Sequence, residues 1–259
     1  MTDGSETAGP SAAAPAPPAG ARAALTRHGP LRVGINTGNG LLVTGRTAEG
    51  APAGVAPDLG AWIAGCLGVG IAYVPYGRPA DLAAAAEDDA WDIAAIGAEP
   101  ERARTIAFTA AYAEIRASFL ARRSEPPSTA DWDRPGQRIA VYRGSAYGLW
   151  LARNTRAATL VERESHAAAL EAFRAGEASL LAGLAQRLDA DAASLPGTRV
   201  LDGAFMAVQQ AVGTPRRNAA AAPWLAAAVE HARSSGLVAA LIARHGVEGL
   251  DVAPAPQAC

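Results

Sequence analysis

Residues 91–102 read WDIAAIGAEPER and join a short apolar run to a charged turn. The run at 93–96 has the length of a buried β-strand, and a Gly-Ala pair leads out of it. Glu99 and Arg102 follow at the carboxyl end of that strand. Ligands of open α/β sheets lie beyond the carboxyl ends of the strands, so this turn is a candidate binding site. The alternative is the solvated start of a helix, which the same residue types also favour.

Strands and helices alternate on the amino-terminal side of this turn. A strand at 31–36 precedes an amphipathic helix with apolar residues at 59, 62, 63 and 66, and a second strand follows at 71–76. An alanine-rich helix at 79–87 leads to the strand at 93–96, after which we expect another helix. This βαβαβ order predicts a parallel sheet.

The pattern restarts beyond residue 119 and forms a second α/β unit. Its predicted strands lie at 138–142, 159–162, 178–182, 198–201 and 205–212, and its helices begin near 145, 165 and 183. From residue 215 the chain is predicted to be helical. Residues 1–30 are rich in Ala and Pro and predict a disordered tail, and residues 251–259 predict a C-terminal tail. No signal peptide is recognisable, so we expect the chain as written to be cytoplasmic, and periplasmic or extracellular only if its true start lies upstream.

Two further places carry candidate ligand contacts. Asn36 and Asn39 stand in the glycine-containing loop after the first strand, where they either face a ligand or do ordinary turn work. A Gly144-Ser145 pair opens a helix whose amino-terminal amides favour an anion, although Ser145 equally fits a plain N-cap. Ser145 as a nucleophile is disfavoured because no nucleophile-elbow motif surrounds it.

Composition excludes several function classes. All 23 basic residues are arginine, so no Schiff base and no lysine of a phosphate-binding loop exist. They are mixed with 25 acids without a basic stripe, which argues against a nucleic-acid partner. The four histidines lack ligand spacing, two cysteines provide no disulfide framework, and no apolar stretch is long enough for membrane insertion. The glycines at 65–70 follow a helix and indicate its C-cap rather than a nucleotide site. We expect no metal and no cofactor.

Several segments in this order resemble the family 3, polar amino-acid type, extracellular solute-binding proteins. The resemblance covers roughly residues 31–250 and rests on LRVGI at 31–35, GVAPDL at 54–59, and WDI at 91–93 followed by PER and FTAAY. It extends to Gly144-Ser145, AFRAG at 172–176 and GLV at 236–238. The start resembles a leaderless branch of the family. Cyclohexadienyl and chorismate dehydratases share this fold.

This resemblance implies an α/β fold of the periplasmic-binding-protein-like type II, with two lobes around a ligand cleft and two hinge crossings. Residues 31–118 and 212–250 would form lobe 1, and residues 119–211 lobe 2. The hinges would lie near 117–119 and 205–212. Arg102 would grip a ligand carboxylate from one lobe, and the amides after Gly144 would help from the other.

The sequence departs from the family pattern where the ligand ammonium is usually bound. An aspartate is common there, but this chain has GLAQ at 183–186, so the α-amino-acid ligand is in doubt. Asn39 replaces a common aromatic residue, and Glu99 is an added acid in a shortened turn. Glu99 either replaces the missing aspartate or acts as an acid or base.

The main hypothesis is a binding protein that closes on a small carboxylate-bearing metabolite, amino-acid-like or an organic acid. The alternative is a cytoplasmic, cofactor-independent lyase or dehydratase with Arg102 as anchor and Glu99 as catalytic acid/base, and a weaker third is a sensor subunit. We expect a monomer, with an ABC-transporter permease as partner if the protein is exported. The predicted ligand-binding residues are Asn36, Asn39, Gly97, Glu99, Arg102, Gly144, Ser145, Ala146, Tyr147 and Gln186.

Overall fold

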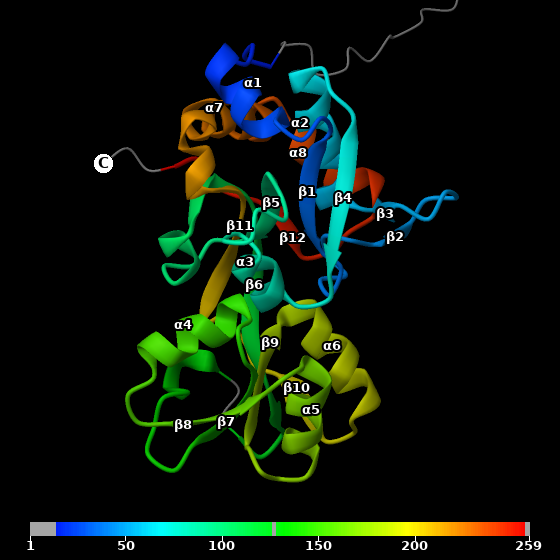
Figure 1. Cartoon of the computed structure of the whole chain (residues 1–259). Helices are drawn as coiled ribbons and strands as arrows, with labels where there is room; N and C mark the ends of the chain where they lie inside the picture. Colours follow the sequence, from blue (N-terminus) through cyan, green and yellow to red (C-terminus); the bar gives the residue numbers. More distant parts are fainter. Residues whose placement is uncertain (1–13, 126–127, 257–259) are drawn as a thin grey trace, which may run out of the picture.

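Two α/β lobes lie one above the other and are joined by long strands (Figure 1). The computed structural model describes residues 14–125 and 128–256. In the first lobe, strands β1 (Leu31–Asn36), β4 (Ile71–Tyr76) and β5 (Ile93–Gly97) are parallel, in the order β4-β1-β5. The predicted parallel βαβαβ unit is therefore confirmed.

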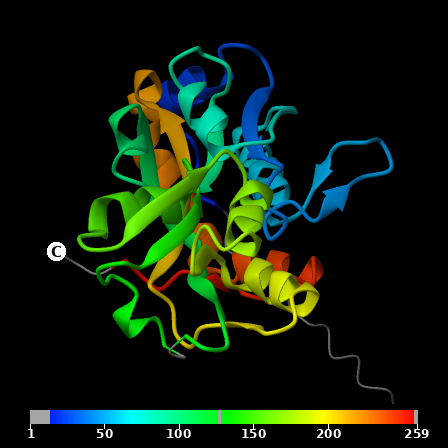
Figure 2. The ribbon, with the colours of Figure 1, turned by 90° about the horizontal axis from the view of Figure 1, so that it is seen from below.

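Helices α2 (Val55–Leu67) and α3 (Pro79–Ala84) connect these strands. The apolar residues of α2 at Leu59 and Ile63 are buried against the sheet. Gly68 ends α2 in the left-handed conformation, with a φ of 64°, and donates to carbonyls of the last turn. The glycine-rich segment is thus a helix C-cap, as predicted. Strands β2 (Gly45–Arg46) and β3 (Pro52–Ala53) form a hairpin that projects from the body of the molecule (Figure 2).

The helix expected after Arg102 is not formed. One 3₁₀ turn, η1 (Arg102–Arg104), is followed by β6 (Ile106–Arg122), a strand of 17 residues. β6 pairs antiparallel with β11 (Met206–Pro215) and then β10 along one edge, and with β12 and then β9 along the other. Partners on both edges satisfy the backbone groups of β6, so pairing across the molecule outweighs its alanine-rich helix propensity.

The second lobe contains a smaller parallel arrangement. Strand β7 (Arg138–Tyr142) pairs parallel with β8 (Thr159–Arg163) and β9 (Leu180–Leu184). The remaining elements of this lobe are η2 (Thr129–Asp131), α4 (Ala146–Asn154), α5 (His166–Arg174), α6 (Ala185–Ser194) and β10 (Thr198–Val200). Strands of both lobes belong to one continuous sheet, ordered β4-β1-β5-β11-β6-β9-β7-β8, because β6 and β11 cross from one lobe to the other.

The C-terminal segment returns to the first lobe. It comprises η3 (Arg216–Ala221), α7 (Ala222–Ser234), α8 (Leu237–Arg244) and β12 (Leu250–Val252). β12 pairs with β6, so the predicted C-terminal tail is ordered strand at its first two residues. No single helix in the described part of the chain is long and apolar enough to cross a membrane. Only the bent pair 216–234 and 237–244 meets the length and composition criteria together.

The prediction of a disordered tail through residue 30 is wrong from residue 19 onward. Helix α1 (Ala19–Thr26) packs on η3, and it buries Ala21 and Leu25. Trp224 also donates from its indole to the carbonyl of Pro15, at 2.8 Å. Two buried apolar side chains and the η3 surface supply the packing that the composition alone does not indicate. Residues 1–13 lie outside the described residues.

The apolar core is divided between the lobes. The largest buried cluster takes residues from α1, α2, β1, β5, α7 and α8, including Ile63 and Leu225. Separate clusters in the second lobe centre on Phe119 and Phe173. Each lobe therefore has its own core, and the surface between them is free to form a cavity.

Candidate functional site

A cavity of about 360 Å³ lies between the two lobes, and side chains of both lobes line it. Most of the predicted ligand-binding residues come together there. Those from the first lobe are Asn36, Asn39, Gly97 and Arg102, and those from the second are Ser145, Ala146, Tyr147 and Gln186. Glu99 and Gly144 are not among the lining residues.

Arg102 is held in the cavity wall by backbone carbonyls of both lobes. Its Nη1 donates to the Gly97 oxygen at 2.7 Å, and its Nη2 donates to the Gly144 oxygen at 2.9 Å. The residue is only 5% exposed, and burial lowers the pKa of its guanidinium to about 10, so the group stays charged at neutral pH. A guanidinium has five N–H donors, so three have no acceptor among the described residues. Those donors are free for a ligand.

Ser145 and the two asparagines line the cavity, but their side chains already have local partners. The Ser145 hydroxyl donates to the Tyr142 carbonyl at 2.7 Å and accepts from the Gly148 amide at 3.0 Å, which is N-cap geometry. Asn36 accepts from the amide of Gly38, and Asn39 accepts from the amide of Leu41. All three therefore do the capping or turn work that the sequence left open as an alternative.

Glu99 is paired with a residue of the opposite lobe and does not line the cavity. Its carboxylate lies 2.6 Å from Nη2 of Arg153 on α4, whose Nη1 lies 2.5 Å from Glu101. Glu99 is 4% exposed, and burial raises its pKa, although Arg153 acts in the opposite direction. Glu99 thus joins an interlobe ion pair and does not replace a ligand-binding aspartate in the cavity.

Gln186 and Tyr147 complete the second-lobe side of the predicted set. The Gln186 amide packs closely on Gly249, where a Cβ would lie 1.4 Å from Nε2, and the φ of 76° at Gly249 also favours glycine. Its Oε1 is buried without a hydrogen-bond partner among the described residues. Tyr147 is 6% exposed, and burial raises the pKa of its phenol. Both side chains reach the cavity as neutral groups.

His166, Arg187, Tyr142 and Gln210 also line the cavity and were missed by sequence reasoning. Nε2 of His166 lies 2.6 Å from the Asp191 carboxylate, which is almost fully buried. The sequence shows His166 only as a histidine in the first turn of a helix. Asp191 stands on another helix, so no local spacing links the two.

The cavity lining carries positive charge and no carboxylate. Arg102, Arg187 and His166 are its basic side chains, and neither Asp nor Glu is among the lining residues of the described chain. An anionic group on a ligand therefore finds donors there, whereas an ammonium finds no carboxylate in the wall.

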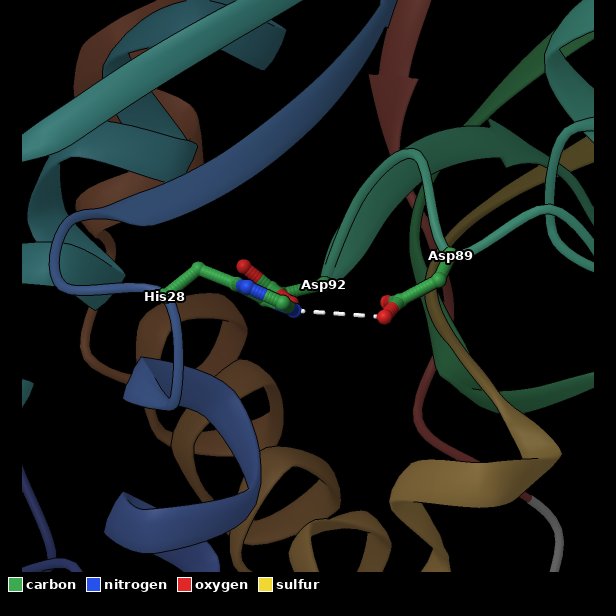
Figure 3. A group of neighbouring side chains, drawn as sticks. All are labelled: His28, Asp89 and Asp92. Carbon is green, nitrogen blue, oxygen red and sulfur yellow. Dashed lines mark hydrogen bonds and ion pairs between the residues drawn. The ribbon is translucent and has the colours of Figure 1, made fainter.

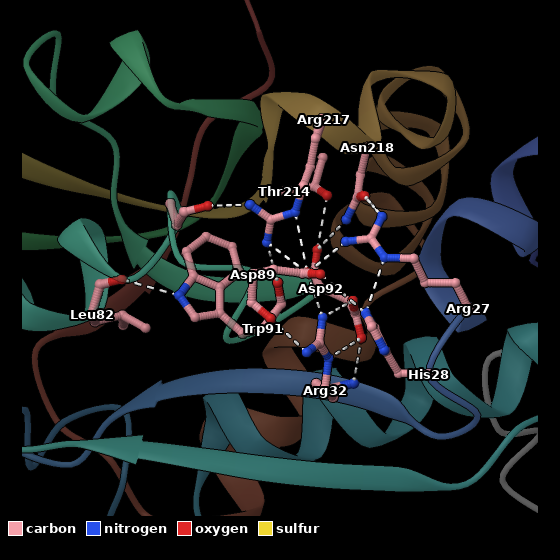
Figure 4. Close-up of polar contacts among 11 residues, drawn as sticks. Arg27, His28, Arg32, Leu82, Asp89, Trp91, Asp92, Thr214, Arg217 and Asn218 are labelled. Carbon is pink, nitrogen blue, oxygen red and sulfur yellow. Dashed lines mark hydrogen bonds and ion pairs between the residues drawn. The ribbon is translucent and has the colours of Figure 1, made fainter.

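A second cluster of charged residues lies away from the cavity, at the amino-terminal ends of β1 and β5. His28, Asp89 and Asp92 bring their ligating atoms within 4.8 Å of one another (Figure 3). However, Arg27, Arg32 and Arg217 converge on the two carboxylates (Figure 4). These arginines hold the pKa of the Asp89 carboxyl well below its usual range, and the Arg32 hydrogen bond is the largest cause. Guanidinium groups occupy the positions a cation would need, so the cluster is an ion-pair network.

The sequence profile of the bacterial extracellular solute-binding proteins, family 3, matches residues 31–248. The chain belongs to this family. No curated protein sequence matches significantly. The resemblance recognised in the sequence is thus confirmed, and the two-lobed fold agrees with it.

Solved structures share the fold of this solute-binding protein at low sequence identity. The L-cysteine solute receptor of Neisseria gonorrhoeae is 18% identical, with a TM-score of 0.70 over 90% of this chain and 99% of that one. A mutant of ArgBP from T. maritima is 18% identical, with a TM-score of 0.69 over 88% and 100%. An ancestral amino acid-binding protein, a precursor of cyclohexadienyl dehydratase, is 20% identical, with a TM-score of 0.66 over 86% and 98%.

Proposed function

We propose that this solute-binding protein binds a small carboxylate-bearing metabolite in the interlobe cavity, with Arg102 as the anchor. The observation that carries the proposal is the state of Arg102: a buried cation with three unused donors, facing a cavity whose described lining has no carboxylate. A planar guanidinium matches a carboxylate bidentately, and a buried charge gains most when an opposite charge reaches it.

The position of Arg102 also links binding to lobe closure. Its two carbonyl partners belong to different lobes, so the guanidinium is oriented only when the lobes meet. A ligand carboxylate that used the remaining donors would add contacts at the same junction. Binding would therefore favour the closed arrangement, as in other hinge proteins. If the protein is exported, an ABC-transporter permease is the partner that would receive the ligand.

The lyase alternative has no comparable support. It requires Glu99 as the acid or base at the substrate, and Glu99 is paired with Arg153 outside the cavity lining. A catalytic base must come within hydrogen-bond reach of the proton that it removes. Binding without chemistry is therefore the function that this geometry favours.

A thermal-shift and calorimetry screen tests the proposal. The probes are simple monocarboxylates and dicarboxylates, together with L-arginine and L-cysteine, the ligands named for related structures. We expect carboxylates to raise the melting temperature, because a ligand that binds only the folded state stabilises it. The Arg102→Ala variant should lose about 2–5 kcal/mol of binding free energy for them.

Arg104→Ala is the matched control, because Arg104 stands in the same 3₁₀ turn but is exposed and does not line the cavity. It should bind like the wild type. If a carboxylate binds Arg102→Ala and wild type equally well, Arg102 is not the anchor and the proposal is wrong.

A further inference from the structure

His166, Arg187 and Asp191 form a second charged group at the cavity. His166 begins α5, and the other two residues stand on α6. Nε2 of His166 lies 2.6 Å from one Asp191 oxygen, and Nε of Arg187 lies 3.6 Å from the other. The side chain of Asp191 is 7% exposed and is not part of the cavity lining, whereas His166 and Arg187 both are. The Asp191 carboxylate thus pairs with His166 and Arg187 from outside the cavity lining, and both basic side chains remain exposed to the cavity.

Gly183 provides the space that His166 occupies. A Cβ at this position would lie 3.1 Å from Cε1 of His166 and 2.8 Å from a methyl group of Leu188. Any larger residue at position 183 would therefore have to displace the imidazole or the Leu188 side chain. The absence of a side chain at Gly183 thus leaves room for the His166 ring beside it.

The free donors of this group point to an acceptor on the ligand. Asp191 is the only partner of the His166 ring in the described chain, so Nδ1 has none. Within the described residues, the only ion pair of Arg187 is the long one with Asp191, and the Arg187 side chain is 60% exposed. With Asp191 held behind them, both basic groups can turn toward a ligand anion. A ligand ammonium would meet only positive charge and neutral dipoles here.

We propose that His166 and Arg187 form a second carboxylate subsite and that the ligand is a dicarboxylate without an ammonium group. One carboxylate takes the unused donors of Arg102. The other takes the Arg187 guanidinium and Nδ1–H of His166, which donates when the ring is an imidazolium with its Nε2–H on Asp191. This inference rests on the proposed function, because it takes Arg102 as the first anchor. It adds the class of ligand, a molecule with two carboxylates. One carboxylate would meet Arg102 of the first lobe, and the other would meet His166 and Arg187 of the second lobe.

The test compares matched ligands by calorimetry on the full chain. Malonate, succinate, glutarate and adipate are set against propionate, butyrate, valerate and hexanoate, and L-glutamate against glutarate. We expect at least one dicarboxylate to bind about tenfold or more tightly than every monocarboxylate, since each carboxylate gains its own charge-assisted hydrogen bonds. Glutarate should bind more tightly than L-glutamate, whose ammonium has no partner.

Two variants test whether His166 and Arg187 cause the preference for dicarboxylates. Arg187→Gln and His166→Leu should each weaken dicarboxylate binding by about tenfold and monocarboxylate binding much less, which removes most of the preference for the dicarboxylate. Arg174→Gln is the control, because this arginine ends α5, pairs with Glu171 and is not in the cavity lining. It should leave the preference intact.

The outcomes separate this inference from the proposed function. Monocarboxylates that bind through Arg102 as tightly as every dicarboxylate would overturn the second subsite alone. A variant at His166 or Arg187 that weakened both ligand classes equally would also overturn it. If no carboxylate binds at all, or if Arg102→Ala binds all of them unchanged, the proposed function fails as well.

Discussion

Arg32 and Arg102 belong to the same lobe and have opposite surroundings. Arg32 donates from Nε and Nη2 to the Asp92 carboxylate at 3.0 and 2.8 Å, and it also reaches the carboxylate and the carbonyl of Asp89. These contacts raise its pKa further above the usual range, and the Asp92 hydrogen bond is the largest cause. Arg102 has only two carbonyl acceptors, and burial lowers its pKa. The pKa values thus move in opposite directions.

This difference separates a structural arginine from a binding arginine. In the network at β1, carboxylates satisfy the guanidinium groups, so no ligand is needed (Figure 4). At the cavity, no carboxylate is hydrogen-bonded to the buried Arg102 guanidinium, although Glu99 and Glu101 act on its charge through space, and a ligand carboxylate would supply the direct partner. The number of free donors is therefore a better guide to the site than the number of arginines.

The largest expected effect is at Asp92, which is fully buried and accepts three hydrogen bonds from Arg32. Asp92→Ala should lower the free energy of unfolding by about 3–5 kcal/mol, because it leaves Arg32 without its buried partner. Urea denaturation measures the change. Asp88→Ala, at an exposed neighbouring aspartate, should cost less than about 0.5 kcal/mol. Equal effects at the two aspartates would show that the network does not stabilise the lobe.

A direct comparison of the two arginines comes next in size. Arg32→Met should lower the unfolding free energy by about 2–3 kcal/mol, since charge-assisted hydrogen bonds to Asp92 are lost. Arg102→Met, measured without ligand, should stay within about 1 kcal/mol of wild type, because lost carbonyl contacts are offset by removing a desolvated charge. Urea denaturation curves of both variants measure the two changes in unfolding free energy. A larger loss at Arg102 than at Arg32 would reverse our assignment of the two roles.

Ser145 tests whether a partnered side chain at the cavity wall contributes to binding. Ser145→Ala should cost about 1 kcal/mol of stability through the lost N-cap of α4, while ligand affinity should change by less than about threefold. Ser165 is the equivalent N-cap of α5 and does not itself line the cavity, so Ser165→Ala should cost the same stability. A much larger loss of affinity at Ser145 would make its hydroxyl a ligand contact.

The smallest expected effect concerns the interlobe pair at Arg153 and its pH dependence. Burial raises the folded pKa of Glu99 above 4.5, so Glu99 favours folding most below that pH, and this contribution is lost as pH rises through the folded value. The pKa of Glu101 is lowered, so its contribution is present at neutral pH and is lost as pH falls through its folded value.

Glu99→Gln should therefore gain stability relative to wild type between about pH 4 and 7, whereas Glu101→Gln should lose it, each by less than about 1 kcal/mol. Urea denaturation at several pH values measures both slopes. Slopes of the same sign would mean that Arg153 does not distinguish the two carboxylates.

Much of the fold and part of the candidate site could be predicted from local pattern. The apolar run before Gly97 forms β5, Gly68 caps α2, and Ser145 and Ser165 cap α4 and α5. Each feature depends on residues within a few positions, where the strand and helix periods and the capping rules apply. The family motif around Arg102 likewise indicated a ligand-binding arginine, and Arg102 does line the cavity.

The longer-range features could not be read in this way. The sequence shows neither that β6 continues for 17 residues nor that α1 folds onto η3, because both depend on partners far along the chain. Glu99 looked like a site residue since it stands three positions before Arg102, yet Arg153 of the other lobe draws it out of the cavity lining.

By itself the sequence determined most of the strands and helices, though neither β6 nor α1, together with the two-lobed family fold and an arginine at a strand's carboxyl end. Only the tertiary structure decided which charges share the cavity. Arg102, His166 and Arg187 meet there, while Glu99 and Asp191 are turned toward partners of their own. The physical reason is that side-chain charges interact through space over a few ångströms, and such separations are set by the packing of two lobes rather than by spacing along the chain.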